Sequence, residues 1–218
     1  MNDFGVIFDM DGVIINSYYY HLQSIKVFAE KHGFQLDEKE IMFKYFGRQN
    51  RVWMPALFDK PMTEDEIAFL AEEKEAIYRQ LYAPHIKPIA GLLPFLQELS
   101  SNDVPMSVGT SAPRSNVDFV LEKTGCKKYF VGIIDDSMAK VGKPDPDVFL
   151  QAAQLIHKPP QQCIVIEDSQ AGIEAGKRTG GKVIAMATTH RRDELPPTDL
   201  TVDDFTQLNL QKLRNLFN

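Results

Sequence analysis

Acidic residues stand at short spacing in two distant parts of the chain. Asp9 and Asp11 follow one short apolar run, and Glu167 and Asp168 follow another. Carboxylates that share one crevice raise one another's pKa or require a cation. Mg²⁺ prefers oxygen ligands and combines one or two carboxylates with water and a phosphate. The pattern therefore predicts a Mg²⁺ site formed by Asp9, Asp11, Glu167 and Asp168.

A carboxylate that stands beside such a cation can attack phosphorus and form an aspartyl-phosphate. Asp9 is the candidate nucleophile because it stands first after its apolar run. Asp11, two residues on, is placed to protonate the leaving oxygen and later to deprotonate water, a contribution of roughly 10²–10⁴-fold in rate. Gly12 lets the backbone turn closely behind this pair.

A transferring phosphoryl group also needs hydrogen-bond donors and positive charge around its oxygens. Thr110 and the backbone N–H groups that follow it can donate, and Lys143, in the run Gly-Lys-Pro-Asp-Pro, can supply the charge. A lone Asp is more often a helix cap, and a lone Lys is more often solvated. Several such segments at strand ends favour the catalytic interpretation.

The elements that would position these residues alternate between strand and helix, which predicts a parallel sheet covered by helices. The expected strands are 4–8, 105–109, 130–134, 163–166, 182–186 and 200–202. The expected helices are 92–99, 115–123, 146–156, 171–178 and 208–216. Ligands of such sheets bind beyond the carboxyl ends of the strands, where the candidate residues stand.

Residues 18–82 have a different sequence pattern, with apolar residues at helical spacing and no clear strand. Thr63 and Glu66 have the spacing of a capping box that opens a long helix. The predicted fold class is α/β, a doubly wound, Rossmann-like parallel sheet with a helical insert after its first strand. We expect residues 1–15 and 83–218 to form the catalytic core and 16–82 to form the insert.

Composition excludes several classes. The 218 residues carry 24 Lys and Arg against 30 Asp and Glu, for a net charge of −6, and no basic run. Nucleic-acid binding is therefore disfavoured, because phosphate contacts need clustered cations. No apolar run approaches the roughly 18 residues that span a bilayer. The two cysteines lack CxxC spacing and no signal peptide is visible, so we expect a cytoplasmic protein without a membrane partner.

In order along the chain, Asp9-Met-Asp-Gly-Val13, Thr110-Ser111, Lys143-Pro-Asp-Pro146 and Glu167-Asp-Ser169 resemble the motifs of the haloacid dehalogenase superfamily. The helical insert looks like that superfamily's small cap. Dehalogenases lack an acid at the place of Asp11, so the chain is more similar to the phosphatases and phosphomutases, and most of all to the β-phosphoglucomutase-like branch.

The resemblance implies that Asp9 is the nucleophile and Asp11 the acid/base, with the Asp11 backbone carbonyl also on the metal. It implies that Thr110 and Lys143 hold the phosphoryl group and that Asp168, with Glu167, completes the Mg²⁺ site. The positions expected to bind substrate are Ser111, Asn116, His21, Lys74, Arg48 and Arg51.

One departure from the branch concerns the cap. The mutase carries a Lys just before a cap glycine, and this Lys grips the distal phosphate, whereas Phe46 precedes Gly47 here. Arg48 and Arg51 follow, and either is a candidate substitute. The departure favours hydrolysis over the mutase reaction.

The sequence therefore predicts a Mg²⁺-dependent phosphatase of a small phosphorylated metabolite, such as a sugar phosphate, that forms an aspartyl-phosphate. The alternative is a β-phosphoglucomutase, and a remote alternative is a receiver-like domain phosphorylated on Asp without turnover. We expect a monomer or a weak dimer.

Overall fold

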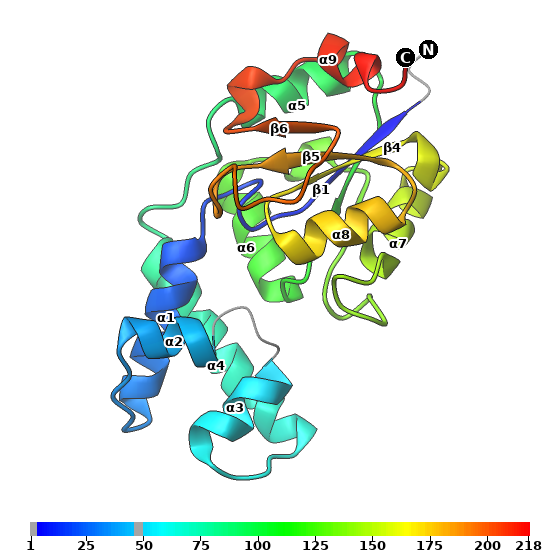
Figure 1. Ribbon diagram of the computed structural model, residues 1–218. Helices are drawn as coiled ribbons and strands as arrows, with labels where there is room; N and C mark the ends of the chain where they lie inside the picture. Colours follow the sequence, from blue (N-terminus) through cyan, green and yellow to red (C-terminus); the bar gives the residue numbers. More distant parts are fainter. Residues whose placement is uncertain (1–3, 46–49) are drawn as a thin grey trace. The chain divides into compact units, whose positions relative to one another are not determined.

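The computed structural model describes residues 4–45 and 50–218 (Figure 1). The chain divides into two compact units, which are considered separately. The first unit contains Met1–Asn16 and Ile86–Asn218, and the second contains Ser17–His85. The expected assignment of 16–82 to a cap domain stays a prediction.

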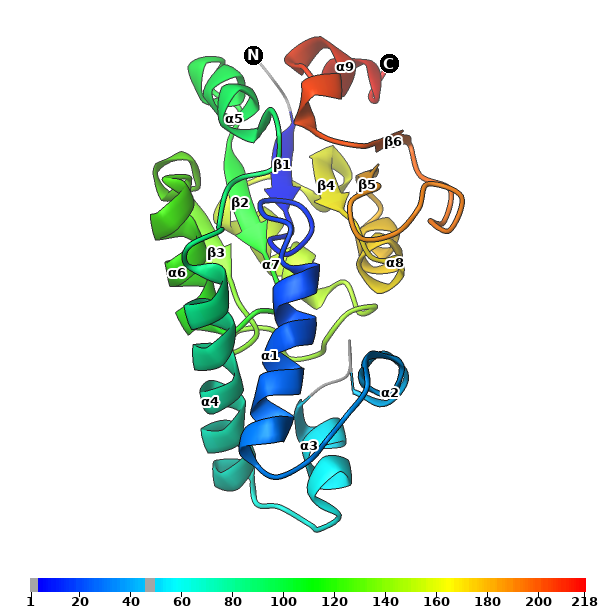
Figure 2. The same cartoon turned by 90° about the vertical axis from the view of Figure 1, so that its left-hand side faces the viewer.

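Within the described residues, the first unit is built on a six-stranded sheet in the order β3-β2-β1-β4-β5-β6 (Figure 2). Its strands are β1 (Gly5–Phe8), β2 (Met106–Gly109), β3 (Gly132–Ile134), β4 (Cys163–Glu167), β5 (Lys182–Met186) and β6 (Leu200–Val202). Every neighbouring pair is parallel, with Val6 of the central strand β1 opposite Met106 of β2 and Ile164 of β4. The predicted α/β fold class is confirmed.

Helices lie in the connections between successive strands from β1 to β5, as expected for parallel neighbours, whereas the segment between β5 and β6 contains no helix. The helices of this unit are α5 (Leu92–Ser101), α6 (Arg114–Thr124), α7 (Asp147–Leu155), α8 (Gln170–Arg178) and α9 (Leu210–Asn215), with short 3₁₀ turns η1 (Lys127–Tyr129), η2 (Pro160–Gln162) and η3 (Phe205–Gln207). Three expected strands begin later than predicted, since β1 begins at Gly5, β2 at Met106 and β3 at Gly132. Pro105 stands outside β2, since proline has no N–H for the ladder, and Phe130 is the C-cap of η1.

The two faces of the sheet are covered by different helices, and β1 shows the division. Ile7 packs into the apolar cluster of α7 and α8, which includes Phe149. The next residue, Phe8, points to the opposite face, where its ring meets Phe95 of α5 and Phe205 of η3 at centroid distances of 6.4 and 6.1 Å. A strand with both faces buried reads as a continuous apolar run, which explains the pattern at 4–8.

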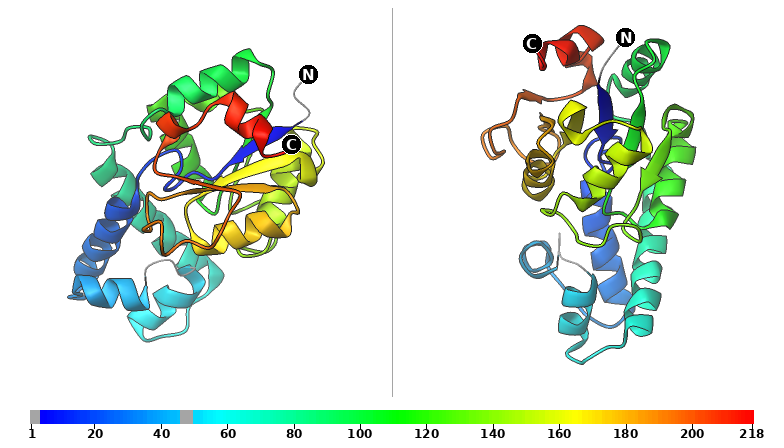
Figure 3. Two further views of the ribbon diagram at one scale, coloured as in Figure 1. Left: turned by 45° about the horizontal axis from the view of Figure 1, so that its top comes forward. Right: turned by 90° about the vertical axis from the view of Figure 1, so that its right-hand side faces the viewer.

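Helix α9 lies beside α5 (Figure 3). The backbone N–H of Leu210 donates to the Glu98 carboxylate of α5 at 3.2 Å. This hydrogen bond joins the C-terminal helix to α5.

The second unit is helical, as its sequence predicts. It contains α1 (Tyr18–Lys31), α2 (Glu38–Lys44), α3 (Asn50–Phe58) and α4 (Glu64–Tyr82). The capping box at the start of α4 is present, since the Thr63 side chain accepts from the Glu66 N–H and the Glu66 carboxylate accepts from the Thr63 N–H. The core of the unit forms around Phe28 of α1 and Trp53 of α3.

None of the helices in the described part of the chain is sufficiently long and apolar to cross a bilayer.

Candidate active site

The carboxyl ends of parallel strands meet at one edge of the sheet, and the candidate residues of the first unit follow these ends. Asp9 directly follows β1 and Thr110 directly follows β2, while Glu167 ends β4 and Asp168 comes next. Lys143 stands in the segment between β3 and α7. The fold therefore gathers segments that are far apart in the sequence at one edge.

Asp9 is fixed by the sheet and buried beside other charges. Its backbone N–H donates to the Ile166 carbonyl of β4 at 3.0 Å, and 5% of the residue is exposed. Burial raises the pKa of Asp9 to about 7; Lys143 opposes this shift and the Glu167 carboxylate adds to it. A further cation at the site would stabilise the Asp9 anion.

Lys143 joins two of the carboxylates. Its Nζ donates to Asp9 Oδ1 at 2.6 Å and to Glu167 Oε1 at 2.8 Å, and it also lies 4.6 Å from the ring centroid of Phe149. Burial alone would lower the pKa of Lys143, but the two carboxylates outweigh it and the pKa is raised. Lys143 therefore stays charged and directs its ammonium group at the candidate nucleophile.

Glu167 is held through both carboxylate oxygens. Oε1 accepts from Lys143, while Oε2 accepts from the N–H groups of Asp168 and Ser169 at 2.7 and 2.6 Å and from the Ser169 hydroxyl at 3.0 Å. Gly172 leaves the space for this, because a Cβ there would lie 1.7 Å from Oε1. Glu167 thus joins Lys143 to the start of α8, and its role as a metal ligand stays a prediction.

Asp168 lies against Gly12 of the loop after β1. Gly12 has a φ of +79°, and a Cβ on it would lie 1.9 Å from Asp168 Oδ2. Burial raises the pKa of Asp168 well above its ordinary value, and the carboxylates of Glu167 and Asp9 add to this shift. The absence of a side chain on Gly12 therefore allows the acids after β1 and β4 to approach each other.

The acidic cluster fits a hard divalent cation. Among the described residues, Asp9, Glu167 and Asp168 each offer a carboxylate oxygen, and these atoms lie within 4.8 Å of one another. The donors are all oxygen, the type that Mg²⁺ prefers. Even with Lys143 present, the pKa values of Asp9 and Asp168 are raised, so the cluster favours additional positive charge.

Asp11 lies in a tight turn next to the nucleophile. It forms a backbone bridge with Ile15, and the Gly12 N–H donates to the Ile15 carbonyl at 2.7 Å. The Asp11 charge also contributes to the raised pKa of Asp9, which places the two acids within electrostatic reach.

The residues after β2 lie on the same edge. Thr110 is buried, its N–H donates to the Ile134 carbonyl of β3 at 3.0 Å, and its hydroxyl accepts from the Ala112 N–H at 3.1 Å. Ser111 is exposed, and Asn116 is buried on α6. Their predicted contacts with a phosphoryl group or substrate stay predictions.

The remaining substrate residues belong to the second unit. The His21 ring stacks on Tyr78 with centroids 3.9 Å apart, Lys74 is buried and forms an ion pair with Glu75, and Arg51 is exposed on α3. Arg48 lies outside the described residues. The structure therefore places these side chains within their own unit, and their contact with substrate stays a prediction.

Two threonines after β5 reach the site but were not predicted. The Thr188 hydroxyl donates to the Gly12 carbonyl at 2.5 Å, and the Thr189 side chain lies near the Asp168 carboxylate. The available signal was their place just beyond the strand at 182–186, at the ligand edge of the sheet.

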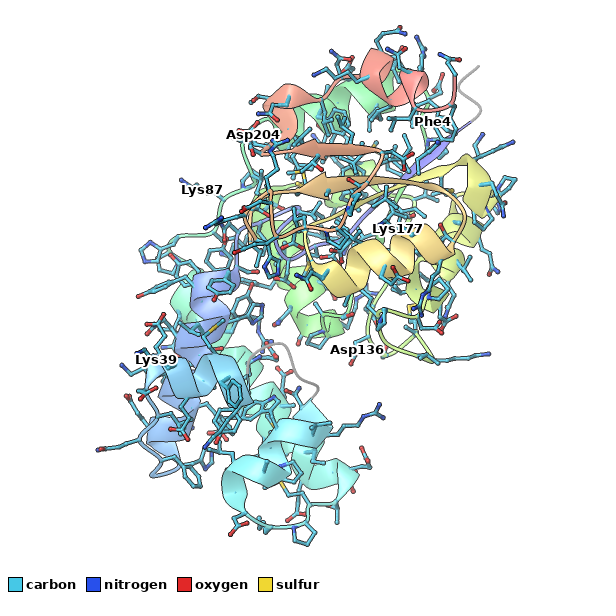
Figure 4. All side chains as sticks on the ribbon, viewed as in Figure 1. Phe4, Lys39, Lys87, Asp136, Lys177 and Asp204 are labelled. Atoms are coloured by element: carbon cyan, nitrogen blue, oxygen red, sulfur yellow. The ribbon has the colours of Figure 1, made fainter. Side chains whose placement is uncertain are left out.

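The end of β3 also carries acidic residues, but they have local partners. Asp135 is buried and accepts from the Ser137 hydroxyl at 2.6 Å. The N–H of the next residue, Asp136, which is labelled in Figure 4, donates to the Ala112 carbonyl. These bonds order the loop between β3 and α7.

Comparison with known proteins agrees with the motifs. A family model described as haloacid dehalogenase-like hydrolase matches residues 6–186. A bifunctional riboflavin kinase/FMN phosphatase of Arabidopsis thaliana is 29% identical over 95% of this chain, which spans 55% of that relative, about half its length. A fructose-1-phosphate phosphatase of Escherichia coli is 29% identical, with 81% of this chain and 92% of the relative covered.

A solved structure is similar over the whole chain. The β-phosphoglucomutase of Clostridium difficile is 28% identical, with a TM-score of 0.80 over 100% of this chain and 98% of that protein. The resemblance inferred from the motifs is confirmed by these matches.

Proposed function

Because the chain belongs to the haloacid dehalogenase-like hydrolase family, we propose that it is a Mg²⁺-dependent phosphatase. Its substrate is a small phosphorylated metabolite of the sugar phosphate class, and the reaction passes through an aspartyl-phosphate on Asp9. The relatives named FMN phosphatase and fructose-1-phosphate phosphatase support phosphomonoester hydrolysis. The proposal includes a cytoplasmic protein, a monomer or weak dimer, without nucleic-acid or membrane partners.

One observation carries the proposal: Asp9 stands at the tip of the central strand with Lys143 Nζ 2.6 Å from its carboxylate. In the first step, an Asp9 oxygen forms a bond to phosphorus while the bond from phosphorus to the leaving oxygen breaks. Asp11 gives its proton to that leaving oxygen. In the second step, water attacks the same phosphorus, Asp11 takes a proton from the water, and Asp9 is released as a carboxylate.

Lys143 supports these steps by charge. Its ammonium group is held by Glu167 at 2.8 Å, so it remains aimed at the place where phosphoryl oxygens would accumulate negative charge. Asp9, Asp168 and Glu167, with the backbone carbonyl of Asp11, would hold the Mg²⁺. When bound, the cation would offset the repulsion between the Asp9 carboxylate and a phosphate dianion.

The second candidate is a β-phosphoglucomutase, favoured by the similarity to the C. difficile enzyme over the whole chain. The first step is the same in both reactions, and the acceptor of the phosphoryl group then differs: water for a phosphatase, a sugar hydroxyl for a mutase. The Phe46-Gly47 pair, where the mutase has a Lys before Gly, favours water.

The test is a phosphate-release screen over phosphorylated metabolites with Mg²⁺, run beside an isomerisation assay with β-glucose 1-phosphate. We expect phosphate release that requires Mg²⁺, is removed by EDTA and is lost in Asp9→Asn, with the circular dichroism spectrum unchanged. Asp11→Asn should slow both steps.

Three results would change the conclusion. Isomerisation without phosphate release would establish the mutase. A long-lived phosphorylated Asp9 without turnover would indicate a receiver-like domain. Undiminished turnover in Asp9→Asn would refute the covalent mechanism.

A further inference from the structure

We infer that Thr188 and Thr189, adjacent residues after β5, are positioning residues that hold the loop after β1 and Asp168 in the relative geometry needed to bind Mg²⁺. The inference rests on the proposed function, because it concerns the same site. It adds the end of β5 to the proposed Mg²⁺ site, whose ligands come from the ends of β1 and β4.

The two groups that the threonines contact are themselves packed against each other. The Asp168 carboxylate occupies the place that a Gly12 side chain would take, 1.9 Å from the position of its Cβ. Gly12 directly follows Asp11, and the loop begins at Asp9. A shift of Gly12 relative to Asp168 would therefore separate the proposed ligands of one cation.

Thr188 fixes one side of this contact. Its hydroxyl donates to the Gly12 carbonyl at 2.5 Å, and the Gly12 N–H donates to the Ile15 carbonyl at 2.7 Å. Both peptide planes that meet at Gly12 are then oriented by hydrogen bonds. The plane that carries the Gly12 N–H also carries the Asp11 carbonyl, so that proposed metal ligand is oriented too.

Thr189 fixes the other side. Its side chain lies near the Asp168 carboxylate, which is 4% exposed and belongs to the residue next to Glu167 in the sequence. A side chain that contacts a ligand carboxylate orients it, and loss of such partners typically lowers metal affinity by about 10- to 100-fold. Because the two threonines are neighbours, a single peptide unit links the residue bonded to the Gly12 carbonyl with the residue beside the Asp168 carboxylate.

The backbone of this segment is itself anchored in the sheet. The N–H of Ala187, just before the pair, donates to the Val202 carbonyl of β6 at 2.8 Å. The loop after β1 is therefore connected to β5 and β6 through the hydrogen bond from Thr188 to the Gly12 carbonyl.

The experiment measures Mn²⁺ binding to the full chain without substrate, from the electron paramagnetic resonance signal of free Mn²⁺. The variants are Thr188→Val and Thr189→Val, which keep the side-chain shape and remove the hydroxyl, and Thr188→Ser and Thr189→Ser, which keep the hydroxyl. The matched control is Thr198→Val, whose hydroxyl donates to the Leu200 carbonyl at 2.9 Å instead of to the acidic site.

We expect each Val variant to raise the Kd for Mn²⁺ by about 10-fold, and each Ser variant and the control to stay within about 2-fold of the wild-type chain. If activity is found, the Val variants should need more Mg²⁺ for half-maximal rate and recover most of kcat at saturating Mg²⁺. A structural role alone would lower stability without this dependence on the cation.

Equal Kd values in the wild-type chain and both Val variants would overturn the inference and leave the proposed function standing. A wild-type chain that binds no Mn²⁺ would overturn both the metal requirement and the inference. Ser variants as weak as the Val variants would show that the hydroxyl groups are not responsible, and would also overturn it.

Discussion

Substitution of Gly12 by Ala should displace the Asp168 carboxylate and weaken metal binding, in addition to straining the backbone at residue 12. Gly12 has a φ of +79° and its missing Cβ would lie 1.9 Å from Asp168 Oδ2. A carbon and an oxygen approach to about 3.3 Å at closest in weak contacts. The Asp168 carboxylate must therefore retreat by more than about 1 Å, the size of displacement that can lower an enzyme's rate about 10²-fold.

Gly125 provides the matched control. Its φ is +69°, and a Cβ on it would meet nothing within 4 Å. Gly125→Ala should cost only the left-handed backbone penalty, about 1–2 kcal/mol of unfolding free energy. Gly12→Ala should add an overpacking cost of about 1–3 kcal/mol, together with a loss of metal affinity of at least about 10-fold.

The assays are guanidinium denaturation in EDTA followed by circular dichroism, and titration calorimetry with Mg²⁺. The difference between the two variants isolates the contact with Asp168 from the strain of the left-handed backbone. Equal unfolding free energies for the two variants, with wild-type Mg²⁺ affinity in Gly12→Ala, would refute the reasoning.

Three further predictions concern buried groups. Lys143→Met should lower the unfolding free energy in EDTA by about 3–5 kcal/mol, because Asp9 and Glu167 lose their buried partner. Added Mg²⁺ should reduce this loss of stability. A loss below about 1 kcal/mol in denaturation curves would contradict the prediction. Burial raises the pKa of Cys163 to about 11 and also raises that of Cys126, so both thiols should resist a disulfide reagent at pH 8 and react once guanidinium unfolds the chain. Since the folded chain keeps the Cys163 proton longer, stability should fall as pH rises from the ordinary thiol value of about 8.5 towards 11. Fast labelling of the folded chain would refute the burial argument.

Much of the fold could be predicted because short sequence patterns mark the ends of its strands and helices. The apolar runs at 182–186 and 200–202 match β5 and β6 at both ends. The capping box at Thr63 marks the start of α4 because its two hydrogen bonds join residues three apart in sequence. Such features depend on a few neighbouring residues, so composition and spacing suffice to find them.

The side-chain contacts of the candidate site could not be predicted in the same way. Lys143 and Asp9 are 134 residues apart, and which carboxylate the ammonium reaches depends on the path of the loop before α7. Glu167 reads as one more acid of a cluster, yet its bonds to Ser169 also hold the start of α8. Thr188 and Thr189 are ordinary residues after a strand, and their partners become visible only when β1, β4 and β5 lie side by side.

The path of the chain into and out of residues 17–85 has a consequence for how such a protein can diversify. Ile15 and Pro88 form an antiparallel bridge, and the Ile89 N–H donates to the Ile14 carbonyl at 2.9 Å, so the ends of the inserted segment are already joined within the sheet unit. The ends of the segment are held together by these contacts, and doubling the length of a flexible loop between fixed ends raises its closure free energy by only about 0.6 kcal/mol. This segment can therefore change in length or sequence during evolution while the sheet that carries the carboxylates of the candidate site stays unchanged.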